Sequence, residues 1–120
     1  MARDFLKSWR ASLAFRRGES CLARGAFHDA ITHFQRTIAL DPKHAAGHSN
    51  LGFCYFRLGR YPAALAAYHT AVELEPEDPE YGCDLGAVYS KLNQPEEALK
   101  AYARVARTHP DHVRAYVGLG

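Results

Sequence analysis

Histidine and cysteine are the residues in this sequence whose spacing invites a test for metal binding or catalysis. His109 and His112 are three residues apart, and His44 and His48 are four apart. At these spacings two histidines can bind the same metal ion. Neither pair has a neighbouring carboxylate or thiolate that completes a ligand set. We therefore expect no metal site and no cofactor.

The three cysteines, Cys21, Cys54 and Cys83, form no CxxC or other close pair. The first residues lack an apolar run of signal-peptide length. Scattered thiols without a secretory signal are typical of a reducing compartment, so the sequence predicts a cytoplasmic protein. No glycine-rich phosphate loop is present, and nothing in the sequence marks a cysteine as a nucleophile. We predict that the chain is not an enzyme.

Charge and hydropathy exclude two further classes of partner. The chain has 15 basic and 13 acidic residues, a net charge of +2, which is too balanced to indicate nucleic-acid binding. The basic excess lies at the start, where residues 1–44 hold eight Lys or Arg and four Asp or Glu, 8 − 4 = +4. No stretch approaches the roughly 18 uninterrupted apolar residues of a membrane span, so the sequence does not favour membrane association.

The chemistry-bearing residues lie on a repeated framework, because the sequence matches itself when it is shifted so that Leu51 falls on Leu85. The matching positions are Leu51-Gly52 with Leu85-Gly86, Tyr55 with Tyr89, Ala64-Leu65 with Ala98-Leu99, Tyr68 with Tyr102, and Pro76 with Pro110. Three full units result, 11–44, 45–78 and 79–112, and residues 113–120 begin a fourth or form a capping helix. A repeat of this length is typical of solenoid proteins, in which each unit buries the apolar face of its neighbour.

Each unit predicts two helices joined by a tight turn. In the second unit, Leu51 and Tyr55 recur at helical spacing. Gly59 suits the left-handed residue that ends a helix, and Pro62 suits the first turn of the next one. Between units, Asp78 is a suitable N-cap. The predicted fold class is all-α, a stack of antiparallel helix-turn-helix hairpins.

The repeat resembles the tetratricopeptide repeat (TPR), whose signature is W-x2-LG-x2-Y, then A-x3-F, then P. The second unit carries it as His48-x2-Leu51-Gly52-x2-Tyr55, Ala64-x3-Tyr68 and Pro76. The first unit is a weaker copy, with Arg17 and Cys21 in the Leu and Tyr slots. The resemblance implies an α-solenoid with a right-handed superhelix. It also implies a scaffold or adaptor function, in which a concave groove binds a peptide or helix of a partner protein.

In this family the first helix of each hairpin lines the groove, so the resemblance implies which residues face a partner. The predicted set is Phe15, Arg16, Glu19, Ser49, Asn50, Phe53, Arg57, Glu80, Asp84, Ala87 and Lys91, and Cys83 shares this face. Phe53 gives the middle of the groove an apolar surface. Glu80 and Asp84 lie one turn apart and form an acidic wall. We therefore expect a peptide with a hydrophobic anchor and basic flanking residues.

One subtype of the family grips the C-terminal carboxylate of heat-shock chaperones with a clamp of Lys, Asn and Arg. The positions that match the clamp are occupied here by Phe15, Glu19, Asn50, Glu80 and Asp84. Only Asn50 agrees, and two acids stand where two cations are required. Because carboxylates repel a carboxylate, we predict that this groove is not a chaperone-tail clamp.

The two ends leave alternatives open. Residues 1–10, MARDFLKSWR, place Phe5, Leu6 and Trp9 on one helical face, which predicts a helical extension that caps the first hairpin. A basic amphipathic helix that lies on a membrane or an acidic partner is the alternative. The open fourth repeat permits self-assembly into a homo-oligomer, and the chain is also compatible with a regulatory N-terminal domain of a larger enzyme.

Overall fold

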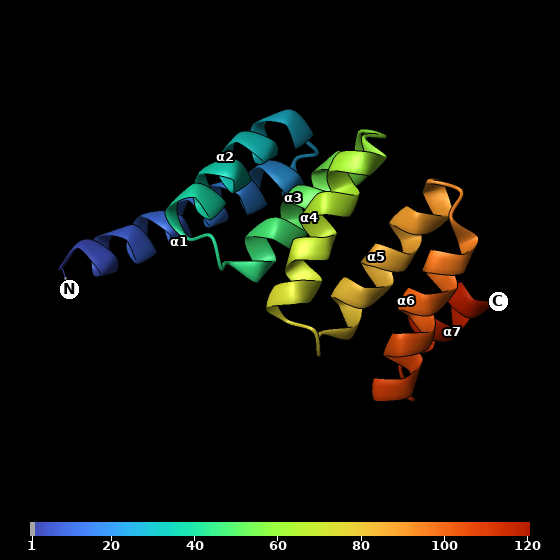
Figure 1. The fold of residues 1–120 in the computed structure, drawn as a ribbon. Coiled ribbons are helices and arrows are strands. Elements are labelled where there is room, and N and C mark those ends of the chain that lie inside the picture. Colours follow the sequence, from blue (N-terminus) through green and yellow to red (C-terminus); the bar gives the residue numbers. More distant parts are fainter. Residues whose placement is uncertain (1) are drawn as a thin grey trace.

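The computed structural model describes residues 2–120 and contains seven α-helices in that range (Figure 1). The helices are α1 (Ala2–Ala23), α2 (Phe27–Leu40), α3 (Ala45–Arg57), α4 (Tyr61–Leu74), α5 (Pro79–Lys91), α6 (Pro95–Thr108) and α7 (Val113–Leu119). No strand occurs among these residues, which confirms the predicted all-α class. Helices α3, α5 and α7 begin at equivalent positions of successive repeats, at Ala45, Pro79 and Val113.

The hairpins stack side by side along one direction. In Figure 1 the colour runs from blue to red across the molecule, and the two termini lie at opposite ends. Contacts join each helix to the next in sequence, and α5 also touches α7. The stack measures 47 × 30 × 21 Å along its principal axes, an elongated shape that agrees with a solenoid.

The turn within each hairpin uses the same left-handed residue. Gly25 has φ +73°, Gly59 has φ +75°, and Asn93 has φ 59° at the equivalent position of the third hairpin. Each is followed by a residue whose N–H donates back to the last turn of the helix, as from Arg60 to the Tyr55 carbonyl at 2.8 Å. This geometry closes a helix end, and asparagine is the residue that best replaces glycine there.

Side chains cap the N-termini of α3 and α5, the first helices of the second and third hairpins. One Asp78 carboxylate oxygen accepts hydrogen bonds from the N–H groups of Glu80 at 2.9 Å and Tyr81 at 3.3 Å. At the start of α3, the Nδ1 atom of His44 accepts from the N–H of Gly47 at 2.9 Å. The Asp78 cap was expected from the sequence, and the His44 cap was not. His44 therefore has a structural use.

A ring lying on a glycine closes each hairpin. The pairs are Gly18 with Phe34, Gly52 with Tyr68, and Gly86 with Tyr102. A Cβ added at Gly52 would lie 3.0 Å from the Tyr68 ring, and one at Gly18 would lie 2.5 Å from the Phe34 ring. Both distances are shorter than the usual contact of about 3.5–4.0 Å between carbon atoms. The Gly of the Leu-Gly pair is thus required by the ring of the second helix.

The helical extension expected at residues 1–10 is seen as the first part of α1 from Ala2 onward, and Met1 lies outside the described residues. Residues 2–10 are exposed: Phe5 is 71% exposed and Trp9 is 58% exposed. Helix α1 has 22 residues and α2 has 14, so α1 extends about 12 Å past its partner. Figure 1 shows this end of α1 projecting beyond α2. Among residues 2–120, no helix combines the length and apolar character needed to cross a membrane.

Candidate functional site

A pocket of about 100 Å³ opens where the second, third and fourth repeats meet. Its lining comes from α3, α4, α5 and α7, and consists of Phe53, Phe56, Tyr68, Asp84, Ala87 and Arg114. Three of these residues, Phe53, Asp84 and Ala87, belong to the groove set expected from the resemblance. The first helices of successive hairpins therefore bring residues from adjacent repeats to one surface.

Aromatic side chains form one wall of the pocket. Phe53 is 39% exposed, which leaves part of its ring free for a ligand. Phe56 is half-buried and packs edge-on against Tyr61, with ring centroids 5.4 Å apart. Phe56 packs against the core, and its remaining surface lines the pocket.

Arg57 extends this wall with a positive charge. Its guanidinium carbon lies 5.2 Å from the centroid of the Phe27 ring and 5.9 Å from that of Phe53. The two rings are themselves 6.3 Å apart in an edge-on arrangement. Cations over aromatic faces at these distances are attracted electrostatically. The side chain is therefore held in place although it is exposed to solvent.

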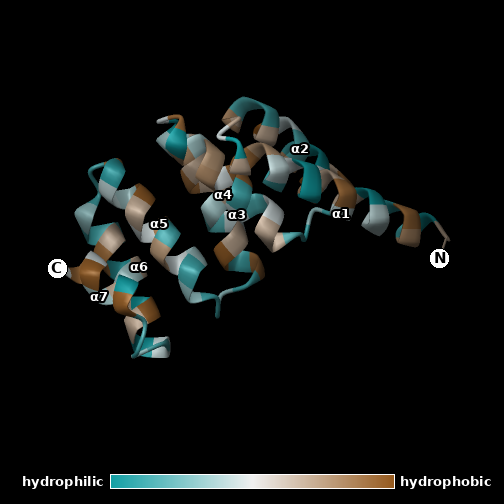
Figure 2. Ribbon diagram, turned by 180° about the vertical axis from the view of Figure 1, so that it is seen from behind, coloured by the Kyte–Doolittle hydropathy of each residue, from teal (hydrophilic) through white to brown (hydrophobic). Residues whose placement is uncertain are grey.

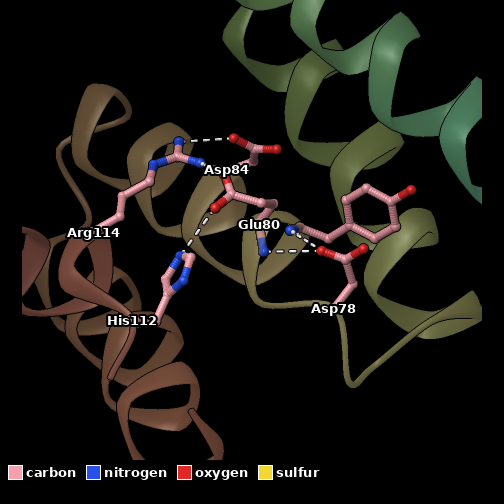
Figure 3. A network of polar contacts seen from close by, with 6 residues as sticks. Asp78, Glu80, Asp84, His112 and Arg114 are labelled. Carbon is pink, nitrogen blue, oxygen red and sulfur yellow. Dashed lines mark hydrogen bonds and ion pairs between the residues drawn. The ribbon is translucent and has the colours of Figure 1, made fainter. Parts of the chain in front are cut away.

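The acidic wall of the third repeat is paired within the chain. Arg114 of α7 donates from Nη1 to Glu80 at 2.9 Å and from Nη2 to Asp84 at 2.8 Å (Figure 3). The Nε2 atom of His112 lies 3.1 Å from the other Glu80 oxygen. The basic flanking residues expected for a ligand thus have a competitor, because an arginine of the same chain already occupies both carboxylates.

Burial sets the electrostatics of this corner. The Asp84 side chain is 22% exposed, and burial raises the pKa of its carboxyl above the ordinary value. The hydrogen bond and charge of Arg114 lower the pKa of Asp84 but do not cancel the effect of burial. Burial by itself lowers the pKa of Arg114, but the hydrogen bonds and charges of Asp84 and Glu80 outweigh it and raise the pKa above the ordinary value, so the guanidinium stays charged. The pair therefore locks α7 to α5 without a large gain in stability.

Other expected groove residues divide into exposed and buried groups. Asn50 is half-buried, and no hydrogen bond within residues 2–120 engages its side chain, so its amide is free for a ligand. Arg16, Glu19 and Lys91 are exposed. Ser49 is only 8% exposed, which leaves its hydroxyl little access to a partner.

Phe15 does not present its ring as free groove surface. Its ring centroid lies 5.7 Å from that of Phe34 and 4.7 Å from that of His44. It therefore packs between the first hairpin and the start of α3. Phe15 was expected as groove surface, but its ring packs against Phe34 and against His44 at the start of α3.

Cys83 does not face the groove either. It is fully buried with Tyr102, Val105 and Ala115 in the core between α5, α6 and α7. Burial raises the pKa of its thiol, and burial raises the pKa of Cys54 to about 11. Neither thiol ionises readily near neutral pH, so neither is an activated nucleophile.

Four residues that build the site were not in the groove set expected from the sequence: Phe27, Phe56, Tyr68 and Arg114. The period contained a signal for one of them. Arg114 stands one repeat length after Glu80, so opposite charges occupy equivalent positions of adjacent repeats. Equivalent positions on neighbouring first helices lie side by side in a solenoid, which favours such a pair.

Comparison with known proteins places this geometry in a family. The model of the tetratricopeptide repeat matches residues 22–83 and 60–120. The chain belongs to the tetratricopeptide repeat family. This confirms the resemblance seen in the sequence, and the TPR hairpins of the fold agree with it.

Two solved structures share the same architecture. The first TPR of Spaghetti (RPAP3), bound to the HSP90 peptide SRMEEVD, superposes with a TM-score of 0.89 and 27% identity, covering 93% of this chain and 89% of that one. MamA superposes with a TM-score of 0.87 and 25% identity, over 91% of this chain and 64% of that one.

A relative with a curated description is much longer. Superkiller protein 3 of Schizosaccharomyces pombe is 49% identical over 41 residues, which is 34% of this chain and 3% of that protein. The chain therefore spans a small fraction of the length of this relative.

Proposed function

We propose that this TPR chain is a protein-interaction module whose concave surface binds an extended peptide or a helix of a partner protein. The pocket at Phe53, Ala87 and Arg114 is the observation that carries the proposal. A related domain at 27% identity is bound to a peptide, which supports this use of the fold. The module acts by binding as a scaffold or adaptor, not as an enzyme.

The physical basis is a surface that is formed before the partner arrives. The groove residues lie on helices that are packed against their neighbours, so binding orders little of the chain itself. An apolar side chain in the pocket covers the exposed part of Phe53, and aromatic residues in such places dominate binding energies. Asn50 offers both a donor and an acceptor to the backbone of an extended peptide.

The proposal excludes the chaperone-tail clamp. Glu80 and Asp84 occupy positions that require cations in that clamp, and Arg114 neutralises only one of their two charges. A terminal carboxylate would therefore meet a net negative surface at this end of the groove. A cytoplasmic location belongs to the proposal as well, because all three cysteines are free and buried.

A peptide selected from a random phage-displayed library provides the test. The purified chain serves as bait, and calorimetry then measures the affinity of the selected peptide for four proteins: the wild type, Asn50→Ala, Phe53→Ala and Ala66→Glu. Ala66 is an exposed residue of α4 in an open depression between α2 and α4, away from the pocket, and serves as the control.

We expect Asn50→Ala and Phe53→Ala each to weaken binding by about tenfold, or about 1.4 kcal/mol, while their melting temperatures stay close to that of the wild type. Ala66→Glu should bind as the wild type does. If the affinity survives both groove substitutions and is lost in Ala66→Glu, the partner uses the outer face and the proposal is wrong.

Self-association through α7 is a second candidate, favoured by one observation. Val113 is 71% exposed, Tyr116 is 49% exposed and Val117 is 74% exposed, which leaves an apolar face on α7. Figure 2 shows hydrophobic residues, in brown, on this helix. Apolar patches of this kind mark interaction surfaces. Light scattering at rising concentration should then show an oligomer that Val117→Glu returns to monomer. A chain that stays monomeric throughout excludes this candidate.

A further inference from the structure

Free positive charge gathers at one edge of the groove. Arg57 lies in the last turn of α3 and Lys91 in the last turn of α5, so the two occupy equivalent positions of adjacent repeats. Both side chains are exposed, and no carboxylate pairs with either within residues 2–120. We name these two residues the basic edge.

The opposite edge has a different charge. Glu80 and Asp84 lie in the first half of α5, and Arg114 satisfies both of them. With a neutral His112, this corner keeps a net charge of −1, from two carboxylates and one guanidinium. The groove therefore has a polarity, positive where α3 and α5 end and weakly negative where α5 begins.

The Arg57 side chain is better pre-organised to bind a carboxylate than the Lys91 side chain is. The Phe27 and Phe53 rings hold its guanidinium at 5.2 and 5.9 Å, which reduces the freedom that the side chain would lose on binding. A guanidinium also offers paired donors in the geometry that a carboxylate accepts. A basic residue of the ligand would instead be repelled by Arg57. At the other edge, the carboxylates of Glu80 and Asp84 that could attract it are already paired with Arg114.

Phe53 links the basic edge to the pocket, since its ring both contacts the Arg57 guanidinium and lines the pocket. The pocket volume of about 100 Å³ is smaller than the cavity of about 150 Å³ that holds benzene, so it suits an aliphatic side chain. Side chains two residues apart in an extended peptide lie on the same side, roughly 7 Å apart. The Phe53 ring can therefore contact an apolar peptide side chain in the pocket. At the same time, the Arg57 guanidinium beside that ring can pair with an acidic side chain two residues along the peptide.

We propose that the groove recognises an extended peptide segment with an aliphatic residue, one intervening residue, and then Glu or Asp. The aliphatic side chain enters the pocket, and the carboxylate pairs with Arg57, with Lys91 available for a second acid. This inference rests on the proposed function and replaces the basic flanking residues expected from the sequence. The negative corner at Asp84 sets the direction of the peptide by repelling an acid at the wrong end of the pocket.

Three short peptides test the inference in a common frame. The probes are Gly-Ser-Leu-Ser-Glu-Ser-Gly, the same peptide with Lys in place of Glu, and the same peptide with Ala in place of Leu. Each is titrated into the isotope-labelled chain, and amide chemical shifts give both the location and the affinity of weak binding. The proteins are the wild type, Arg57→Glu and the control Arg60→Glu, which makes the same charge change at an exposed residue three positions later.

The Leu-Glu peptide should shift the amides of Phe53, Arg57 and Ala87 and should bind at least about tenfold more tightly than the Lys and Ala versions. Arg57→Glu should reverse the preference between Glu and Lys, and Arg60→Glu should keep it. Equal binding of the Glu and Lys peptides, a preference unchanged in Arg57→Glu, or no shift with the Leu-Glu peptide overturns the inference. The library-selected peptide decides separately whether the groove binds peptides at all.

Discussion

Replacing Gly18 by alanine tests the ring-on-glycine packing that holds each hairpin together. The new methyl carbon would lie 2.5 Å from Cε1 of Phe34, with two further ring carbons at 2.8 Å. The ring must retreat by about 1 Å to reach an ordinary carbon contact. Phe34 is fully buried, and the centroids of the Phe15 and Phe34 rings are 5.7 Å apart. The Phe34 ring therefore has no solvent-filled space into which it can move.

Two effects of opposite sign decide the magnitude. Alanine stabilises a helix relative to glycine by about 1 kcal/mol, and overpacking a well-filled core costs about 1–3 kcal/mol. Because a 2.5 Å approach is at the severe end of contacts, we take the upper half of that range. Gly18→Ala should therefore lower the free energy of unfolding by about 1–2 kcal/mol.

Urea unfolding followed by far-UV circular dichroism measures this difference. Ser20→Ala is the matched control, since Ser20 is exposed on the same helix and its replacement improves helix propensity without a clash. Phe34→Leu, which shortens the opposing side chain, completes a double-mutant cycle. In the Phe34→Leu background, Gly18→Ala should cost at least about 0.5 kcal/mol less than in the wild type.

If Gly18→Ala unfolds at the same urea concentration as the wild type or at a higher one, the Phe34 ring does not require a glycine at position 18. Additive effects of the two substitutions would likewise mean that the methyl group and the ring do not meet. A loss of stability in Ser20→Ala would show that α1 responds to any change, and would remove the significance of the comparison.

Two further predictions follow from the core and from the ion pair. Ala64→Arg should unfold the chain at room temperature, seen as loss of helical dichroism, because Ala64 of α4 is fully buried in a core cluster with Tyr68, Leu85 and Val88; a folded variant contradicts the packing. The raised pKa of Asp84 means that its ionisation opposes folding, so its contribution to stability is greatest below the unfolded pKa and falls as the pH rises through the folded one. Wild type should therefore lose stability relative to Asp84→Asn over that interval, and a constant or opposite difference in urea titrations contradicts the assignment.

The period made the architecture readable from the sequence. Positions one repeat length apart carry the same small, aromatic or turn residue, and the structure places Gly25, Gly59 and Asn93 at the same left-handed turn. The asparagine shows why the pattern survives a substitution: the backbone conformation is what repeats, and more than one residue type adopts it. Helix starts at Ala45, Pro79 and Val113 follow from the same repetition.

The candidate site was less predictable, because side-chain direction depends on neighbours that the period does not specify. Phe15 and Phe53 both belong to first helices, yet Phe15 is covered by His44 and Phe53 is left 39% exposed. The pairing of Arg114 with Glu80 and Asp84 depends on α7 lying beside α5, a contact between repeats. The apolar face of residues 2–10 indicated a helix correctly but gave no sign that α2 is too short to cover it.

The most direct test of the central claim maps the library-selected peptide onto the isotope-labelled chain by amide chemical shifts. If the concave surface is the binding site, the largest shifts will fall on Phe53, Ala87 and Arg114 around the pocket. Shifts confined to Ile38, Ala66 and Thr70, in the depression between α2 and α4, would contradict the claim.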